Sequence, residues 1–265
     1  MNTSMTVTLL RHGAIVQGRV LSALMLREIH TINGNSKLGY LWVLIQSVFS
    51  IAVFWGIREY MGAHAPHGIS MPLFLAVGFG LWGIFSGTIN KTMSAVEGNR
   101  ALLSFPQVTE LDVMIGRMLV IAATQYLTIL LIVGADALVA NPLEISSIFT
   151  ALSVIILLPL LSLGIGMILG ALAVFLPVLE KLVPMVLRIA FFVSGVFFSV
   201  SAFKQDVAEI LLWNPVFNAI ELLRMSLYAA YKVDGLSLNY LAVATIVSLS
   251  LGMLFERYVR ARRKS

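Results

Sequence analysis

The chain has 265 residues, of which 59% are hydrophobic and only 12% are charged, and its formal net charge is +5 at pH 7. A soluble domain has about 25% charged residues, so this composition indicates an integral membrane protein. No stretch is polar enough to form a separate catalytic domain, and residues 1–265 are therefore expected to form one membrane domain. The absence of cysteine excludes disulfides, thiolate metal sites and a cysteine nucleophile.

The first element, residues 5–33, is predicted to be an amphipathic helix in the membrane interface. Arg19 and Arg27 interrupt its apolar residues too often for a signal peptide or a membrane span. Val16 and Val20 repeat at helical spacing, which favours a helix whose arginines face anionic headgroups. A disordered cytosolic tail is the alternative.

Six membrane-spanning helices are expected after this element, because a span needs about 20 largely apolar residues. They are residues 38–57, 71–90 and 111–139, a helix within 145–179, a helix that begins after Lys181 and includes Arg188, and residues 236–255. Glycine pairs spaced by four residues, Gly83/Gly87 and Gly166/Gly170, let helix backbones approach closely. Packing within the chain and dimerisation explain them equally well.

The distribution of basic residues orients these spans. Six spans place both termini on one side, and of the 18 Lys and Arg residues only Arg58, Lys204, Arg224 and Lys232 then lie on the other side. The positive-inside rule therefore predicts that both termini are cytoplasmic.

The connection between the second and third spans, "EGNRALLSFPQVTE" at residues 97–110, is cytoplasmic in this orientation but has an apolar middle. A helix capped by Asn99 and ended by Pro106 would expose Leu102, Leu103 and Phe105 to water. These apolar side chains must be buried, either in a groove on a soluble partner or in the membrane interface.

The segment 201–232 is too apolar for open water, but its apolar stretches are too short to span the membrane. A pair of short helices dipping into the outer leaflet, broken at Trp213, Asn214 and Pro215, fits both facts, since Asn214 before a proline can cap the next helix. A structural hairpin that skims the lipid is the alternative.

No catalytic motif for a phosphate loop, a zinc protease or a serine hydrolase is present, so the sequence does not predict an enzyme. Arg188 lies in an apolar segment, where it either reaches cytoplasmic headgroups or faces a pathway and attracts anionic cargo. With it, the candidates to line such a pathway are aromatic residues that could stack on sugar rings: Trp42, Trp82, Phe85 and Phe191.

Four stretches, "LREIHTINGNSKLGYLWVLI", "GNRALLSFPQVTELDVMIGR", "LPVLEKLVPMVLRIAFFVSGVFFS" and "NPVFNAIELLRMSLY", carry a family resemblance over most of the chain. Together they resemble the permease subunits of ABC-2 class exporters, specifically the KpsM-type capsular polysaccharide export permeases. The resemblance implies a homodimer of six-span subunits in the bacterial inner membrane, each paired with a separate cytoplasmic ATPase that binds ATP and Mg. The cargo it implies is a lipid-linked acidic polysaccharide. It implies no cofactor in this chain and no nucleic acid, and it suggests docking of periplasmic and outer-membrane export proteins.

The resemblance also implies roles for three segments. Residues 5–33 would be the interfacial helix, residues 98–107 a coupling helix that docks on the ATPase, and residues 201–232 periplasmic gate helices. The coupling residues would be Asn99, Arg100, Leu102, Leu103, Phe105 and Pro106, and the gate residues Trp213, Asn214, Pro215, Glu221 and Arg224. A lateral path for the lipid headgroup is hypothesised near Arg27, His30, Lys37 and Tyr40.

Three rival functions remain from the sequence. The first is an ABC-2 permease for O-antigen, teichoic acid or a drug. The second is an ion-coupled carrier, which usually shows internal repeats and intramembrane acids. The third is a membrane-bound glycan enzyme, which would need paired carboxylates in a cleft.

Overall fold

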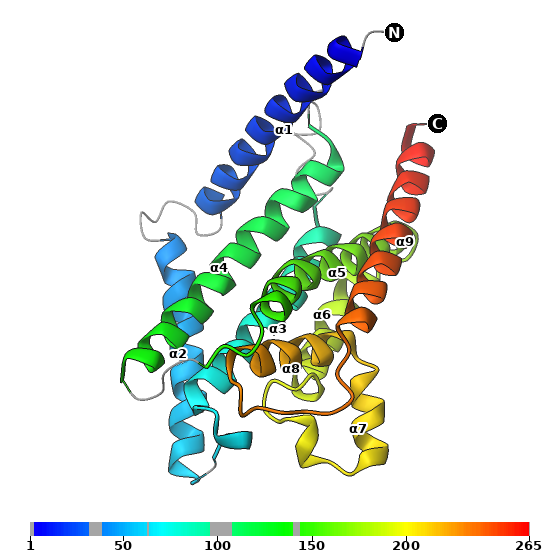
Figure 1. Cartoon of the computed structure of the whole chain (residues 1–265). Helices are drawn as coiled ribbons and strands as arrows, with labels where there is room; N and C mark the ends of the chain where they lie inside the picture. Colours follow the sequence, from blue (N-terminus) through cyan, green and yellow to red (C-terminus); the bar gives the residue numbers. More distant parts are fainter. Residues whose placement is uncertain (1–2, 32–38, 63, 96–107, 140–143, 265) are drawn as a thin grey trace.

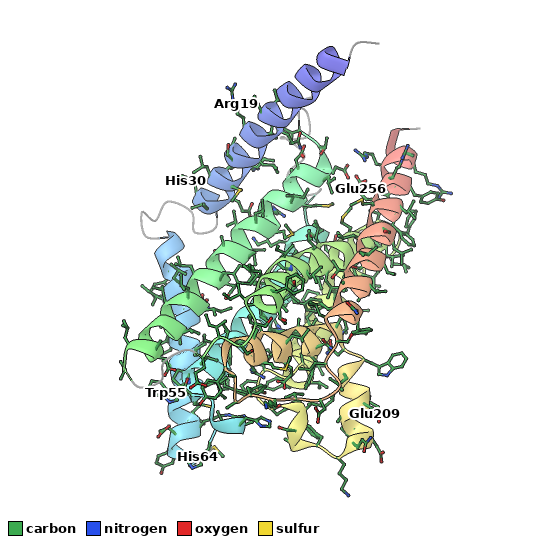
Figure 2. All side chains as sticks on the ribbon, in the orientation of Figure 1. Arg19, His30, Trp55, His64, Glu209 and Glu256 are labelled. Atoms are coloured by element: carbon green, nitrogen blue, oxygen red, sulfur yellow. The ribbon has the colours of Figure 1, made fainter. Side chains whose placement is uncertain are left out.

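A computed structural model describes residues 3–31, 39–62, 64–95, 108–139 and 144–264, and these residues form an all-helical protein (Figure 1). Its helices are α1 (Thr3–Thr31), α2 (Gly39–Tyr60), α3 (Met71–Met93), α4 (Glu110–Val139), α5 (Ile148–Phe175), α6 (Leu179–Val193), α7 (Gln205–Leu212), α8 (Pro215–Leu227) and α9 (Leu238–Lys264). Both termini lie at the same end of the molecule (Figure 1). Arg19 and Glu256 lie toward that end, while His64 and Glu209 lie at the opposite end (Figure 2).

Among the described residues, four helices are long and apolar enough to cross a membrane, namely α3, α4, α5 and residues Leu238–Arg262 of α9. Helix α6, expected as the fifth span, has 15 residues. At about 1.5 Å per residue it is shorter than the ~30 Å hydrocarbon core. The structure thus supports four of the expected spans by length and composition, and the six-span arrangement remains a prediction.

Helix α3 forms the centre of the fold, because α4, α5 and α8 all pack against it. Its side chains Phe74, Leu81 and Ile84 are completely buried. Helices α5 and α9 form another close pair. A Cβ added to Gly164 of α5 would lie 2.5 Å from the backbone carbon of Ser248 in α9, so only glycine permits this approach.

The glycine pairs predicted from the sequence pack within the chain. A Cβ on Gly83 would lie 2.7 Å from the Gln125 side chain of α4, and one on Gly166 would lie 2.8 Å from Thr92 of α3. The pattern therefore serves the contacts of α3 with α4 and α5, and it gives no support to the dimerisation alternative.

Side chains cap the starts of α4 and α8, and the cap of α8 was predicted from the sequence. Thr109 and Asp112 form a reciprocal cap at the start of α4: the Thr109 N–H donates to the Asp112 carboxylate (2.9 Å), and the Asp112 N–H donates to the Thr109 hydroxyl (3.2 Å). The Asn214 side chain accepts from the N–H of Val216 (3.0 Å), and Pro215 occupies the first turn of α8. The expected break between two short helices is thus present between α7 and α8.

Candidate functional site

Aromatic rings from α2, α3, α6 and the turn after α6 gather into one aromatic cluster. Its members are Phe54, Phe79, Trp82, Phe85, Phe191, Phe192 and Phe197. The ring centroids of Phe54 and Phe197 are 5.1 Å apart, and those of Phe79 and Phe191 are 5.3 Å apart. These separations are in the range of favourable aromatic pairs. Trp82 is buried within the cluster, and Phe192 is exposed at its edge.

Three of the five predicted channel-lining residues, Trp82, Phe85 and Phe191, meet in this cluster. Arg188 is exposed on α6 one turn before Phe192, so both side chains emerge on the same helix face. Trp42 is exposed near the start of α2, whereas the cluster contains Phe54 from the opposite half of that helix. Exposed aromatic surface therefore lies beside the positive charge of Arg188. The aromatic faces can stack on sugar rings, and the charge can attract anions.

Sequence reasoning missed Phe54 and Phe79, although they connect the rings of α2 and α6. Each lies in a run of apolar residues, where one more phenylalanine is no signal by itself. Their role depends on three helices meeting, which no local pattern reports.

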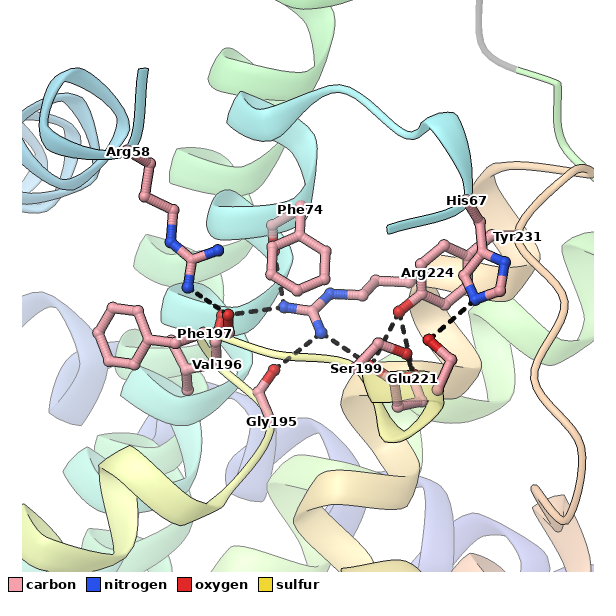
Figure 3. Close-up of polar contacts among 11 residues, drawn as sticks. Arg58, His67, Phe74, Gly195, Val196, Phe197, Ser199, Glu221, Arg224 and Tyr231 are labelled. Carbon is pink, nitrogen blue, oxygen red and sulfur yellow. Dashed lines mark hydrogen bonds and ion pairs between the residues drawn. The ribbon is translucent and has the colours of Figure 1, made fainter. Parts of the chain in front are cut away.

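The turn that follows α6 is fixed by a buried arginine (Figure 3). One guanidinium nitrogen of Arg224 donates to the Gly195 carbonyl (2.8 Å), and the other donates to the carbonyls of Phe74 (2.8 Å) and Val196 (3.1 Å). The guanidinium carbon also lies 3.5 Å from the Phe74 ring centroid. Arg224 therefore joins α8 to α3 and to residues 194–199.

Glu221 neutralises this arginine. Its carboxylate lies 2.8 Å from Arg224 Nη1, and both side chains are completely buried. It also accepts hydrogen bonds from the Ser199 hydroxyl (2.7 Å) and the Tyr231 hydroxyl (3.0 and 3.1 Å). Burial raises the pKa of Tyr231 above its usual range, so this tyrosine acts as a hydrogen-bond donor at neutral pH. A buried ion pair is tolerated when both partners are hydrogen-bonded in this way.

Further contacts extend from this network toward the C-terminal end of α2. Arg58 of α2 donates to the Phe197 carbonyl. His67 lies 3.1 Å from the Ser201 hydroxyl, and its ring meets the Tyr231 ring edge-on at 5.0 Å. The backbone that carries Phe197 into the aromatic cluster is thus held by arginines from two helices.

The predicted gate residues fall into two groups. Trp213 is 79% exposed, and Asn214 and Pro215 form the helix start described above. Glu221 and Arg224 lie inside the protein, where they hold the turn after α6. The spacing of Glu221 and Arg224, three residues apart on a helix, was the available sequence signal for this pair.

At the end that carries the termini, α1 is tied to α3 and α4 by ionic contacts. Glu28 of α1 lies 3.3 Å from Arg117 of α4 and 3.8 Å from Lys91 of α3. Arg117 also donates to the Lys91 carbonyl (2.8 Å), and the Gln17 side chain donates to Asp112. The two helix ends that flank residues 96–107 are therefore joined to the first helix.

Only some of the residues predicted to bind the lipid headgroup or the ATPase lie among the described residues. Arg27 and His30 are exposed on α1, and the His30 ring nitrogen lies 2.7 Å from the Leu26 carbonyl of its own helix. Lys37 and the Tyr40 side chain lie outside the described residues. So do the coupling residues Asn99, Arg100, Leu102, Leu103, Phe105 and Pro106.

Comparisons with known proteins agree over nearly the whole chain. The family model for the ABC-2 type transporter matches residues 19–228. The chain is 33% identical to the polysialic acid transport protein KpsM of Escherichia coli over 250 residues, covering 93% of this chain and 96% of that protein. It is 25% identical over 257 residues to the capsule polysaccharide export inner-membrane protein BexB of Haemophilus influenzae, with 94% of each chain covered. It is 23% identical over 239 residues to the corresponding protein CtrC of Neisseria meningitidis serogroup A, with 90% of each covered. The chain belongs to the ABC-2 type transporter family.

Proposed function

We propose that this chain is the membrane-spanning permease subunit of an exporter that moves a lipid-linked acidic capsular polysaccharide outward across the bacterial inner membrane. The observation that carries the proposal is the aromatic cluster with Arg188 at its exposed edge. Aromatic faces suit the apolar faces of sugar rings, and a cation suits an acidic polymer. Family membership and the names of the three relatives support the same cargo class.

The proposal includes a homodimer. Helix α6 buries only Val183 and Leu187 among its described side chains, while Met185, Ile189 and Phe192 are exposed. A charged Arg188 on this open face is costly in lipid but not beside a second subunit that encloses a hydrated path. Two copies related by a two-fold axis would bring two such faces together.

The energy source in this proposal is a separate cytoplasmic ATPase, which holds the ATP and Mg. Residues 98–107 form its docking helix, and six spans place both termini in the cytoplasm. The ionic contacts of Glu28 support the coupling, because force on residues 98–107 would act on α3 and α4, to which α1 is joined. Residues 201–232 act as the outer gate, on which periplasmic and outer-membrane export proteins dock.

Export is tested in cells that lack their own capsule permease but contain the cognate ATPase. The wild-type chain is expected to restore polysaccharide at the cell surface, and Arg188→Glu to reduce it strongly. Arg257→Glu is the matched control, since Arg257 is exposed on α9 and lies outside both the aromatic cluster and the proposed gate. Equal export by both charge reversals would remove Arg188 from the path, and no export by the wild type would refute the cargo.

Coupling is tested separately by pull-down of the ATPase from detergent extracts. The double substitution Leu103→Asp and Phe105→Asp is expected to abolish association while membrane insertion is unchanged. Phe149→Asp, an exposed phenylalanine on α5, serves as the matched control. Association that survives the double substitution would exclude residues 98–107 as the docking helix.

A further inference from the structure

A cavity of about 500 Å³ opens at the outer end of the molecule, between α7, α8 and the start of α9. The cavity shares no described residue with the aromatic cluster. Trp213, Asn218 and Tyr240 are among the residues that line it. Its volume is within the range of small-molecule sites, which is about 300–1,000 Å³. Gly235 also lines it, and a Cβ there would lie 2.7 Å from the Leu212 side chain, so glycine permits this close contact in the wall.

Two aromatic residues lie at the cavity, and a hydrogen bond joins one to the backbone of the other. Trp213 is 79% exposed although it lies on the turn between two packed helices. The Tyr240 hydroxyl donates to the Trp213 carbonyl (2.5 Å), which ties the start of α9 to this turn. An open indole beside a cavity is a surface on which a flat apolar face can stack.

The polar groups of the cavity mostly accept hydrogen bonds. The Asn218 residue is 1% exposed, and its Oδ1 has no hydrogen-bond partner among the described residues. An unpaired buried carbonyl oxygen costs free energy that a donor from a ligand would recover. Glu209 adds a carboxylate. Ser237 Oγ accepts from the Tyr240 N–H (3.2 Å), which leaves its own hydrogen free to donate.

This lining selects the chemistry of the ligand. An anion such as a lipid phosphate would face Glu209, and the described lining residues include no Lys or Arg to offset that charge. A bound metal ion is not indicated, since the described residues contain no group of three or more suitable ligands. A ligand with one apolar face and several hydroxyl donors satisfies both the indole and the acceptors.

We propose that the cavity bounded by Trp213, Tyr240, Glu209 and Asn218 is a sugar-binding subsite that takes an uncharged pyranose ring. The ring stacks on Trp213, and its hydroxyls donate to Glu209 and Asn218. The biological role of this subsite rests on the proposed function, because the sugar ring would belong to the glycan as it leaves the outer face. The binding chemistry itself stands on the cavity alone.

The test is saturation-transfer difference NMR on the full-length chain in nanodiscs, with free N-acetylglucosamine as the neutral probe and glucuronic acid as the anionic probe. N-acetylglucosamine is expected to receive saturation at its ring protons, and Trp213→Ala to weaken its binding about tenfold. Tyr60→Ala is the matched control, because Tyr60 is 94% exposed near the same end but does not line the cavity. Glu209→Gln is expected to raise glucuronic acid binding relative to N-acetylglucosamine, a change that loss of folding cannot produce.

The outcomes separate this site from the export function. No saturation transfer to N-acetylglucosamine, or transfer that Trp213→Ala leaves unchanged, would overturn the subsite even if the wild-type chain exports polysaccharide. In that case Trp213 is an interfacial membrane anchor. Sugar binding that depends on Trp213 supports the subsite even in a chain that fails to restore export, and that failure would count against the proposed function alone.

Discussion

Replacement of Arg224 by methionine should be among the most destabilising single changes in the half of the protein opposite the termini. The substitution leaves Glu221 buried with a charge and no ionic partner, and it leaves the carbonyls of Phe74, Gly195 and Val196 without this donor. Removing one partner of a buried ion pair costs about 3–5 kcal/mol. For a protein of this size each kcal/mol lowers the melting temperature by roughly 2–4 °C, so we expect a fall of about 6–20 °C.

The assay is thermal unfolding of the purified chain in nanodiscs, followed by tryptophan fluorescence. Arg188→Met is the matched control, because it removes an exposed arginine and should leave the melting temperature nearly unchanged. The double variant Glu221→Gln with Arg224→Met should recover part of the loss, since no charge is then left unpaired. A melting temperature for Arg224→Met within about 2 °C of wild type would refute the argument that this pair holds the turn after α6.

Three further predictions follow from single contacts. Gly164→Ala should cost about 1–3 kcal/mol by separating α5 from α9, whereas Gly134→Ala, whose Cβ would meet nothing within 4 Å, should not lower the melting temperature; equal effects would contradict close packing at Gly164. Glu28→Gln should weaken the docking of α1 by about 1–2 kcal/mol, seen as faster amide hydrogen exchange across α1 with α9 as the internal reference; unchanged exchange would show that the ionic contacts do not hold α1. Because the pKa of Tyr231 is raised in the folded state, its stabilising effect is complete below about pH 10 and is lost as pH rises further. Melting temperatures between pH 8 and 11 should therefore fall more steeply for the wild type than for Tyr231→Phe, and parallel curves would argue against the shift.

Local features of the sequence were sufficient to predict the helices and several of their ends. The spans now seen as α3, α4, α5 and α9 follow from uncharged apolar length, which depends only on neighbouring residues. The start of α8 follows from Asn214 before Pro215, because a cap is formed within one turn of the chain. Part of the aromatic cluster was also expected, from the side chains that could line a path.

The family could also be recognised from the sequence, because the resemblance covers most of the chain. The comparisons confirm this family. The length of α6 was not available, because its apolar run continues past Val193 into the turn at residues 194–199. Arg224 and Arg58 donate to carbonyls of that turn, and both arginines are 28 or more residues away from those carbonyls.

The sequence by itself determined that this is a helical membrane protein. The sides on which its charges lie and the place of a partner surface remain predictions. Only the tertiary structure decided which charges are buried: Glu221 and Arg224, which the family resemblance assigns to the gate, form an internal pair that contacts Phe74, Ser199 and Tyr231. The physical reason is that hydropathy reports the cost of placing a charge in an apolar environment, whereas the compensating hydrogen bonds come from segments up to 150 residues distant.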